Sequence, residues 1–339
     1  MKGQIRFRPT DHHYVMSASL TVEHKVMPTQ PYARSYGALD LRRGARQTAE
    51  QPGGEESMPR SQPTARQRRL GTELRKMREA AGMTARRAAE LIGTNPIQMS
   101  QVEAGKAGIS EARLRYMASQ YACFDTALID ALVAMAGERG KGWWEEHRGL
   151  LAHGALDLAE LEHHATHMRM LQASYVPGLL QTEAYIRALM AYAVPPLPPP
   201  HLDALVSFRL RRREVLSQDS AITFSALIHE SVLRTRVADR KVAREQLASI
   251  LEQSERPNVT VRVIPFDVDG FGGAGNSMLY VGGPVPKLDT AQIDAMHGSF
   301  WMDAESELTR YRALLDKAEA SSLAVGASRD FIHRIAQEI

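Results

Sequence analysis

Apolar residues recur every three or four positions between residues 66 and 137, the spacing of one buried face on a series of short α-helices. Leu70, Leu74 and Met77 form such a stripe in a first helix, predicted over 66–82. Two shorter helices follow at 84–92 and 95–104. A fourth and a fifth helix come after them, and the fifth ends at residue 137. The pattern predicts an all-α domain of five helices.

The second and third of these helices are separated by a tight turn at glycine. The Thr84 hydroxyl can cap the second helix, and Gly93 can end it in the left-handed conformation that favours glycine. Asn95 is a cap for the third helix, with Pro96 at the first position, where a missing N–H does no harm. Two short helices joined in this way form a helix-turn-helix, whose second helix enters the major groove of DNA.

Residues 66–121 resemble the Xre, or phage-repressor, type of helix-turn-helix domain. The resemblance rests on the segments LRKMREAAGMT, AAELIG and MSQVEAGK. It implies a five-helix DNA-binding domain that regulates transcription, and a structural ion pair between Arg78 and Glu103 that joins the first helix to the third. The family often has glutamine just after the cap of its second helix. This chain has Ala85 there, so we expect no base or phosphate contact from that position.

The outward side of residues 95–104 supplies the candidate base contacts, which are Asn95, Ile97, Gln98 and Gln101. The amides of Gln98 and Gln101 can bond adenine in a bidentate manner, and Ile97 can contact a thymine methyl group. An alternative stands beside each of the last three residues: Gln98 serves its own helix cap, Gln101 reaches only a phosphate, and Ile97 lies under the turn. The candidate phosphate contacts lie at helix starts or just past a helix end, and are Thr84, Arg86, Arg87 and Lys106.

The positive charge of the chain is concentrated on the same segment. Residues 60–121 contain twelve Lys or Arg and five Asp or Glu, whereas residues 122–339 contain 22 and 28. Neutralising DNA phosphates releases counterions and supplies most of the non-specific affinity of a DNA-binding protein. Double-stranded DNA is therefore the expected partner of the first domain, and the acidic remainder is not expected to bind it.

The pattern changes near residue 155. Strand-like segments at 222–230, 259–266, 277–283 and 290–298 are interleaved with helical ones, and two helices follow at 303–320 and 326–338. The predicted fold class is α+β: the all-α domain at 60–137, a helical connector at 138–155, and a mixed α/β domain at 156–339 with a small, mainly antiparallel sheet. Residues 1–59 show no sustained period, so we expect a disordered extension, or a protein that starts at Met58.

The second half of the chain also has a recognisable pattern, in VPGLLQTEAYIRAL, FRLRRREVL, LIHESVLR and REQLASILEQSERPNVTVRVIPF. These segments resemble a domain that follows the helix-turn-helix in actinobacterial regulators, some of which are antitoxin-like proteins of the Scr type. The resemblance implies a transcriptional regulator, expected as a homodimer, whose second domain dimerises or binds a partner or effector. The alternative is an antitoxin that binds a small protein encoded by a neighbouring gene and uses DNA binding for autoregulation.

Other classes of protein are disfavoured by the motifs. We find no nucleophile elbow, Walker loop, dinucleotide fingerprint or metal triad, so we expect no enzyme and no cofactor. His163, His164 and His167 are close in sequence, but they lack a convincing further ligand, and no metal site is expected. The chain has no apolar run of membrane-spanning length, and its single cysteine, Cys123, fits a reducing compartment. We expect a cytoplasmic protein without membrane contact.

Overall fold

The computed structural model describes residues 62–138, 142–217, 222–273, 275, 277–295 and 298–339. The predicted N-terminal extension and the alternative start at Met58 lie outside the described residues.

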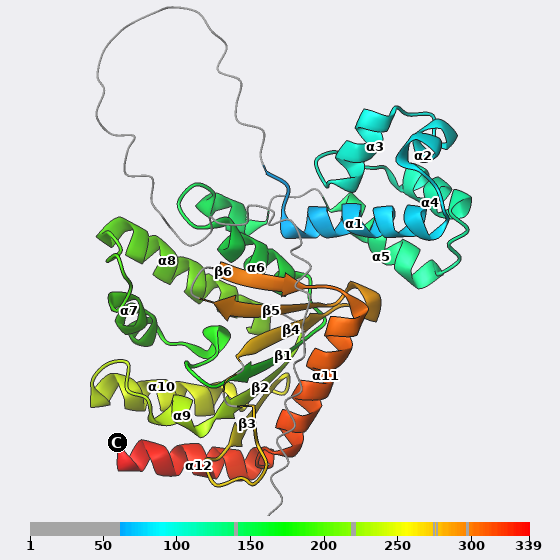
Figure 1. Cartoon of the computed structure of the whole chain (residues 1–339). Coiled ribbons are helices and arrows are strands. Elements are labelled where there is room, and N and C mark those ends of the chain that lie inside the picture. Colours follow the sequence, from blue (N-terminus) through cyan, green and yellow to red (C-terminus); the bar gives the residue numbers. More distant parts are fainter. Residues whose placement is uncertain (1–61, 139–141, 218–221, 274, 276, 296–297) are drawn as a thin grey trace, which may run out of the picture. The chain divides into compact units, whose positions relative to one another are not determined.

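Five short helices make up the first part of the described chain (Figure 1). They are α1 (Ala65–Ala80), α2 (Ala85–Leu91), α3 (Pro96–Glu103), α4 (Glu111–Gln120) and α5 (Thr126–Gly137). Every one begins at a side chain that accepts the backbone N–H three residues later: Thr64, Thr84, Asn95, Ser110 and Asp125. The turns that follow α1, α2 and α3 each contain a glycine with positive φ, namely Gly82, Gly93 and Gly105. Local chemistry thus sets where these helices start and where the first three stop.

One apolar core holds the five helices together. Side chains from α1, α3, α4 and α5 meet in it without solvent exposure, among them Leu74, Met99, Leu114 and Leu132. Ala88 and Ala89 of α2 are small and fully buried, which lets α2 lie close to α3. The predicted all-α domain is confirmed.

The rest of the chain forms a mixed sheet with helices. The helices are α6 (His153–His163), α7 (Glu183–Ala191), α8 (Pro199–Arg212), α9 (Glu230–Arg234), α10 (Arg240–Gln253), α11 (Glu305–Ala320) and α12 (Val325–Glu338). The strands are β1 (His167–Gln172), β2 (Thr223–His229), β3 (Val259–Ile264), β4 (Met278–Gly282), β5 (Thr290–Ala295) and β6 (Gly298–Met302). Short 3-10 helices lie at Trp143–His147, Gly178–Leu180, Arg213–Ser217 and Pro286–Leu288. The predicted α+β class is confirmed.

The strands lie in the order β3-β2-β1-β4-β5-β6. β1, β2 and β3 run parallel, and β4, β5 and β6 join antiparallel to the β1 side. The predicted single strand at 290–298 is wrong in one respect: β5 ends at Ala295, and a separate strand, β6, pairs back onto it. The alternation that would have indicated β6 is weak, because GSFWM has one polar side chain, Ser299, followed by three apolar residues in a row.

Both faces of the sheet are covered. Phe224, Ala226 and Ile228 of β2 point to the face that packs on α10 and α12, through residues such as Ile250, Ile332 and Ile335. Leu227 points to the other face, where it joins Leu308, Leu315 and Ala318 of α11. This alternation follows from the two-residue period of a strand. Ala226, Leu227 and Ile228 are accordingly three consecutive buried apolar residues, as expected where a strand is covered on both faces.

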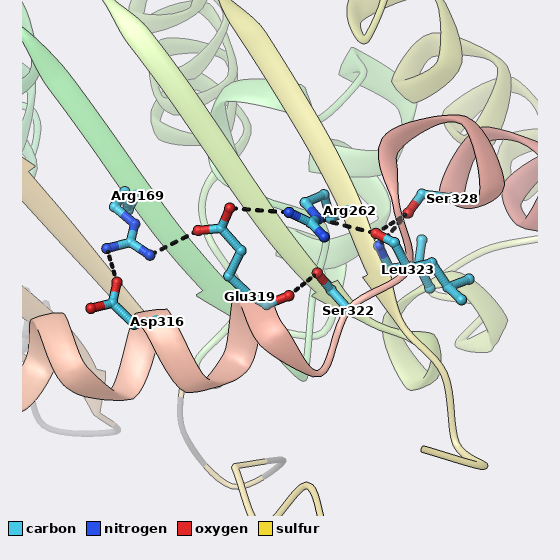
Figure 2. Close-up of polar contacts among 8 residues, drawn as sticks. Arg169, Arg262, Asp316, Glu319, Ser322, Leu323 and Ser328 are labelled. Carbon is cyan, nitrogen blue, oxygen red and sulfur yellow. Dashed lines mark hydrogen bonds and ion pairs between the residues drawn. The ribbon is translucent and has the colours of Figure 1, made fainter. Parts of the chain in front are cut away.

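The β3 edge of the sheet is closed by the chain itself (Figure 2). The Val263 carbonyl accepts the Leu323 N–H at 2.8 Å, and the Val263 N–H donates to the Ser328 hydroxyl at 3.0 Å. Arg262 donates to the Leu323 carbonyl and to Glu319, which also accepts from Arg169 of β1. The junction between α11 and α12 thus satisfies backbone groups that an edge strand would otherwise present to solvent.

Candidate nucleic-acid interface

The predicted recognition helix is α3, and its start is set by Asn95. The Asn95 side-chain oxygen accepts the Gln98 N–H at 2.7 Å, and Pro96 occupies the first helical position. Met99 and Val102 are buried against the core, which fixes the side of α3 that faces inward. The opposite side of α3 is therefore held toward solvent.

Three of the candidate base contacts lie on or near this outward side. Ile97 is 75% exposed and Gln101 is exposed, while Gln98 is half-buried. Among the described residues, no side-chain hydrogen bond occupies the amide of Gln98 or Gln101. The cap of α3 uses the backbone N–H of Gln98 rather than its amide. Both amides can therefore turn toward a base edge.

Asn95 is placed differently from the other candidate base contacts. Its side-chain oxygen is committed to the cap of α3, so a base contact from Asn95 would have to come from the amide nitrogen. A lone amide donor cannot form the bidentate pair that identifies adenine. The geometry thus gives Gln98 and Gln101 a greater capacity for base recognition than Asn95.

The candidate phosphate contacts are solvent-accessible. Arg86 and Arg87 are both exposed, and each lies near Glu90, at 3.4 and 3.6 Å. Exposed pairs of this kind contribute little, so either guanidinium can leave Glu90 for a phosphate. The Thr84 hydroxyl accepts the Arg87 N–H at 3.2 Å and keeps its own proton to donate. Lys106, beyond the end of α3, is exposed as well.

Arg78 and Glu103 form a buried ion pair between α1 and the end of α3. Arg78 donates from Nε to Glu103 Oε1 at 2.6 Å and from Nη2 to Oε2 at 3.0 Å. A third bond, at 2.7 Å, goes to the Met83 carbonyl in the turn before α2. Both charged side chains are only 8% exposed. One guanidinium thus ties the recognition helix and the preceding turn to α1.

Two glycines allow this close approach of α1 to α3, and the sequence interpretation did not assign them a role. A methyl group added to Gly71 would lie 2.5 Å from the Glu103 carbonyl oxygen, and one added to Gly105 would lie 2.6 Å from that of Gln67. Glycine inside a helix costs stability relative to alanine. Gly71 within the predicted first helix was the available signal of a tight packing site.

Tyr121, at the end of α4, lies close to the buried pair. Burial, with the negative charge of Glu103, raises the pKa of the Tyr121 phenol to about 12. Its buried hydroxyl makes no hydrogen bond within the part of the chain that the structure describes. The phenol therefore stays protonated and contributes through its ring.

The histidines noted in the sequence make aromatic contacts of their own. The His163 ring packs against Trp144 with centroids 5.1 Å apart, whereas His167 stacks on Tyr280. No group of three metal-ligating side chains is found in the described segments. On α8, Arg211 pairs with Glu146 and Arg212 pairs with Glu162. None of the described helices is long and apolar enough to cross a membrane.

Two regions of the chain match models of known protein families. Residues 69–132 match a helix-turn-helix domain. Residues 155–334, more than half of the chain, match the model described as a domain of unknown function, DUF5753. The chain belongs to the DUF5753 family. Neither curated proteins nor solved structures give a match. The chain thus has a helix-turn-helix domain followed by a DUF5753 domain. The helix-turn-helix match supports a DNA-binding regulator.

Proposed function

We propose that this DUF5753 protein is a sequence-specific transcriptional regulator of the Xre type that places α3 in the major groove. The observation that carries the proposal is the outward side of α3. There Ile97 and Gln101 are exposed, while Met99 and Val102 anchor the helix from behind. A rigid helix with uncommitted amides facing solvent is what direct base recognition requires.

The surrounding cations supply the second part of the proposal. Arg86, Arg87 and Lys106 would bind phosphates and set the orientation of α3 on the duplex. The net positive charge of residues 60–121 supports this assignment. Base identity would then be selected by Gln98 and Gln101, with Ile97 sensing a thymine methyl group.

Selection of a binding site from random duplexes, followed by fluorescence anisotropy at several salt concentrations, tests the proposal. We expect the logarithm of the association constant to fall linearly with the logarithm of salt. Gln101→Ala should cost about 1–3 kcal/mol and relax the preference at one base pair. Arg87→Ala should weaken binding to all sequences and reduce the salt slope by about 1.

A matched control is Lys241→Ala, which removes an exposed cation from α10 of the DUF5753 domain. This substitution should leave both the affinity and the salt slope unchanged. Binding that does not depend on salt would refute the phosphate assignment. An equal effect of Lys241→Ala and Arg87→Ala would show that the α2–α3 surface is not the site.

We further propose that the DUF5753 domain dimerises or binds a partner, in line with the two half-sites that helix-turn-helix proteins read. The alternative, an antitoxin that binds a small neighbouring protein, stays a prediction, because no contact or exposed surface among the described residues favours it specifically. Co-expression with the product of an adjacent gene would test it, since an antitoxin should co-purify with that product in a fixed ratio.

A further inference from the structure

The two edges of the sheet differ in the way their backbone groups are satisfied. At the β3 edge, the backbone of Val263 bonds to Leu323 and to Ser328. At the other edge, β6 pairs with β5 on one side only. Within the described residues, its outward backbone N–H and carbonyl groups make no hydrogen bond to any other segment. The β6 edge is therefore a free hydrogen-bonding template.

The side chains of β6 do not protect this edge. Proteins usually guard an open edge with lysine, proline, a bulge or an inward-pointing charge. The β6 sequence, GSFWM, has no charged residue and no proline. Phe300, at its centre, is 59% exposed, and Trp301 and Met302 are half-buried. An uncharged strand with an exposed aromatic ring at its centre is suited to pairing.

We propose that β6 is the dimerisation element of this protein, and that it pairs antiparallel with β6 of a second copy. The inference rests on the proposed function, because a reader of two half-sites needs two copies. A twofold axis through the middle of β6 makes the interface self-complementary, with residue i of one copy against residue j of the other and the reverse. The two six-stranded sheets would then form one continuous sheet.

Charge compatibility favours a second copy as the occupant. Since β6 is uncharged, self-pairing opposes no like charges within the strand. In the centred register Phe300 lies opposite Phe300 of the second copy, and such aromatic cross-strand pairs are favourable. Met302 and Ile293, on the same face of the sheet as Phe300, already pack in the core beneath α11. The paired rings would extend that apolar layer.

The contact between two five-residue strands is small, so we expect a dimer in the micromolar range that DNA reinforces. An interface below about 1,200 Å² is typical of transient complexes. Two half-sites on one duplex hold two copies at a high effective concentration, which adds to a weak contact without new interactions. Association in free solution should accordingly depend on protein concentration.

Sedimentation velocity of the full chain across a wide concentration range tests the proposal, with Phe300→Lys and Phe300→Glu as the variants. Each variant alone should weaken association by at least about tenfold, because like charges would face each other across the axis. An equimolar mixture should restore association as a heterodimer. Tyr192→Lys is the matched control, since it places the same charge at an aromatic residue that is 87% exposed elsewhere.

Several results would overturn the proposal: a wild-type chain that stays monomeric, a mixture that fails to associate, or an equal effect of Tyr192→Lys. Hydrogen exchange of the β6 amides gives a second reading that does not depend on the variants. Their protection should rise with protein concentration. Protection that is constant in a monomeric chain would mean that another segment of the same chain covers β6, and would also refute the inference.

Failure of the proposed role of β6 can be distinguished from failure of the proposed DNA-binding function. A monomeric Phe300→Lys variant should still bind a single half-site through α3 with salt-dependent affinity. Loss of dimerisation with half-site binding intact supports the role of β6. If the wild-type protein binds no duplex at any salt concentration, the proposed function fails, while the oligomeric state of the free chain still decides the role of β6.

Discussion

Removing one partner of the buried pair of Arg78 and Glu103 should cost far more stability than removing one partner of an exposed ion pair in the same domain. Replacing Arg78 by methionine removes three hydrogen bonds and leaves the Glu103 carboxylate without a partner. Breaking a buried pair in this way costs about 3–5 kcal/mol. Glu103→Met leaves the guanidinium with the Met83 carbonyl and a 3.5 Å contact with Glu79, and we expect a loss of about 3 kcal/mol.

The double variant, Arg78→Met with Glu103→Met, should be much less destabilised than the sum of the two. It leaves no uncompensated charge, and two apolar side chains of similar size fill the space. We expect a loss of about 1 kcal/mol, mainly from the unpaired Met83 carbonyl. The coupling energy of the cycle, the sum of the two single losses minus the double loss, should then be about 5–7 kcal/mol.

Native-state hydrogen exchange followed by mass spectrometry is the suitable assay, because the three tryptophans all lie outside residues 65–137. Peptides that cover α1 and α3 report the free energy of opening for this domain alone. The control is Arg75→Met, which removes the exposed pair with Glu79 on the same helix and should cost about 0.5 kcal/mol or less. Additive losses, or single-variant losses below about 1 kcal/mol, would refute the buried clamp.

Three further outcomes are expected. Gly71→Ala forces the end of α3 away from α1 and should destabilise the helix-turn-helix domain by about 1–3 kcal/mol, as measured by hydrogen exchange. The control is Gly154→Ala, which has open space around the added methyl group and should not destabilise α6. Tyr121→Phe removes a buried hydroxyl without a partner and should raise the free energy of opening of α4 by about 1 kcal/mol; a clear loss would reveal a bond to that hydroxyl. Burial between Phe266 and Phe271 lowers the pKa of His229. As pH falls below about 6.5, the imidazole therefore takes up its proton in the unfolded chain before it does so in the folded one, and the free energy of unfolding decreases. His229→Asn keeps a cap for α9 and should make the free energy of unfolding depend less on pH in that window. Urea unfolding followed by tryptophan fluorescence at several pH values measures this, and an unchanged pH profile would contradict the assignment.

The helix-turn-helix domain was predictable because its signals are local. Thr84, Gly93 and Asn95 each act within three or four residues, so the sequence places α2 and α3 to within a residue or two. The commitment of the Asn95 oxygen and the half-burial of Gln98 depend on neighbouring turns, and they emerge only from the folded domain. The same holds for Gly71, whose role depends on a backbone that lies more than thirty residues away along the chain.

The sheet was less predictable because its strand pairings are not local. The apolar runs of β2 and β3 identified strands, and no feature of those runs shows that they pair in parallel beside β1. The weak alternation of β6 concealed the last hairpin, although Asp294, Ser299 and Gln292 form a small polar cluster across it. Register and strand order are set by tertiary packing on α11 and α12, which single segments do not encode.

The capping of β3 by the junction of α11 and α12 has a consequence for synthesis of the chain. Ser328, Ile332 and Ile335 complete both the edge and the core beneath it, yet they are made more than sixty residues after β3. The five locally specified helices can fold as they leave the ribosome, since short-range contacts form fast. The helix-turn-helix domain of a nascent chain would thus fold first, while the parallel strands stay exposed to other chains until the final helix is made.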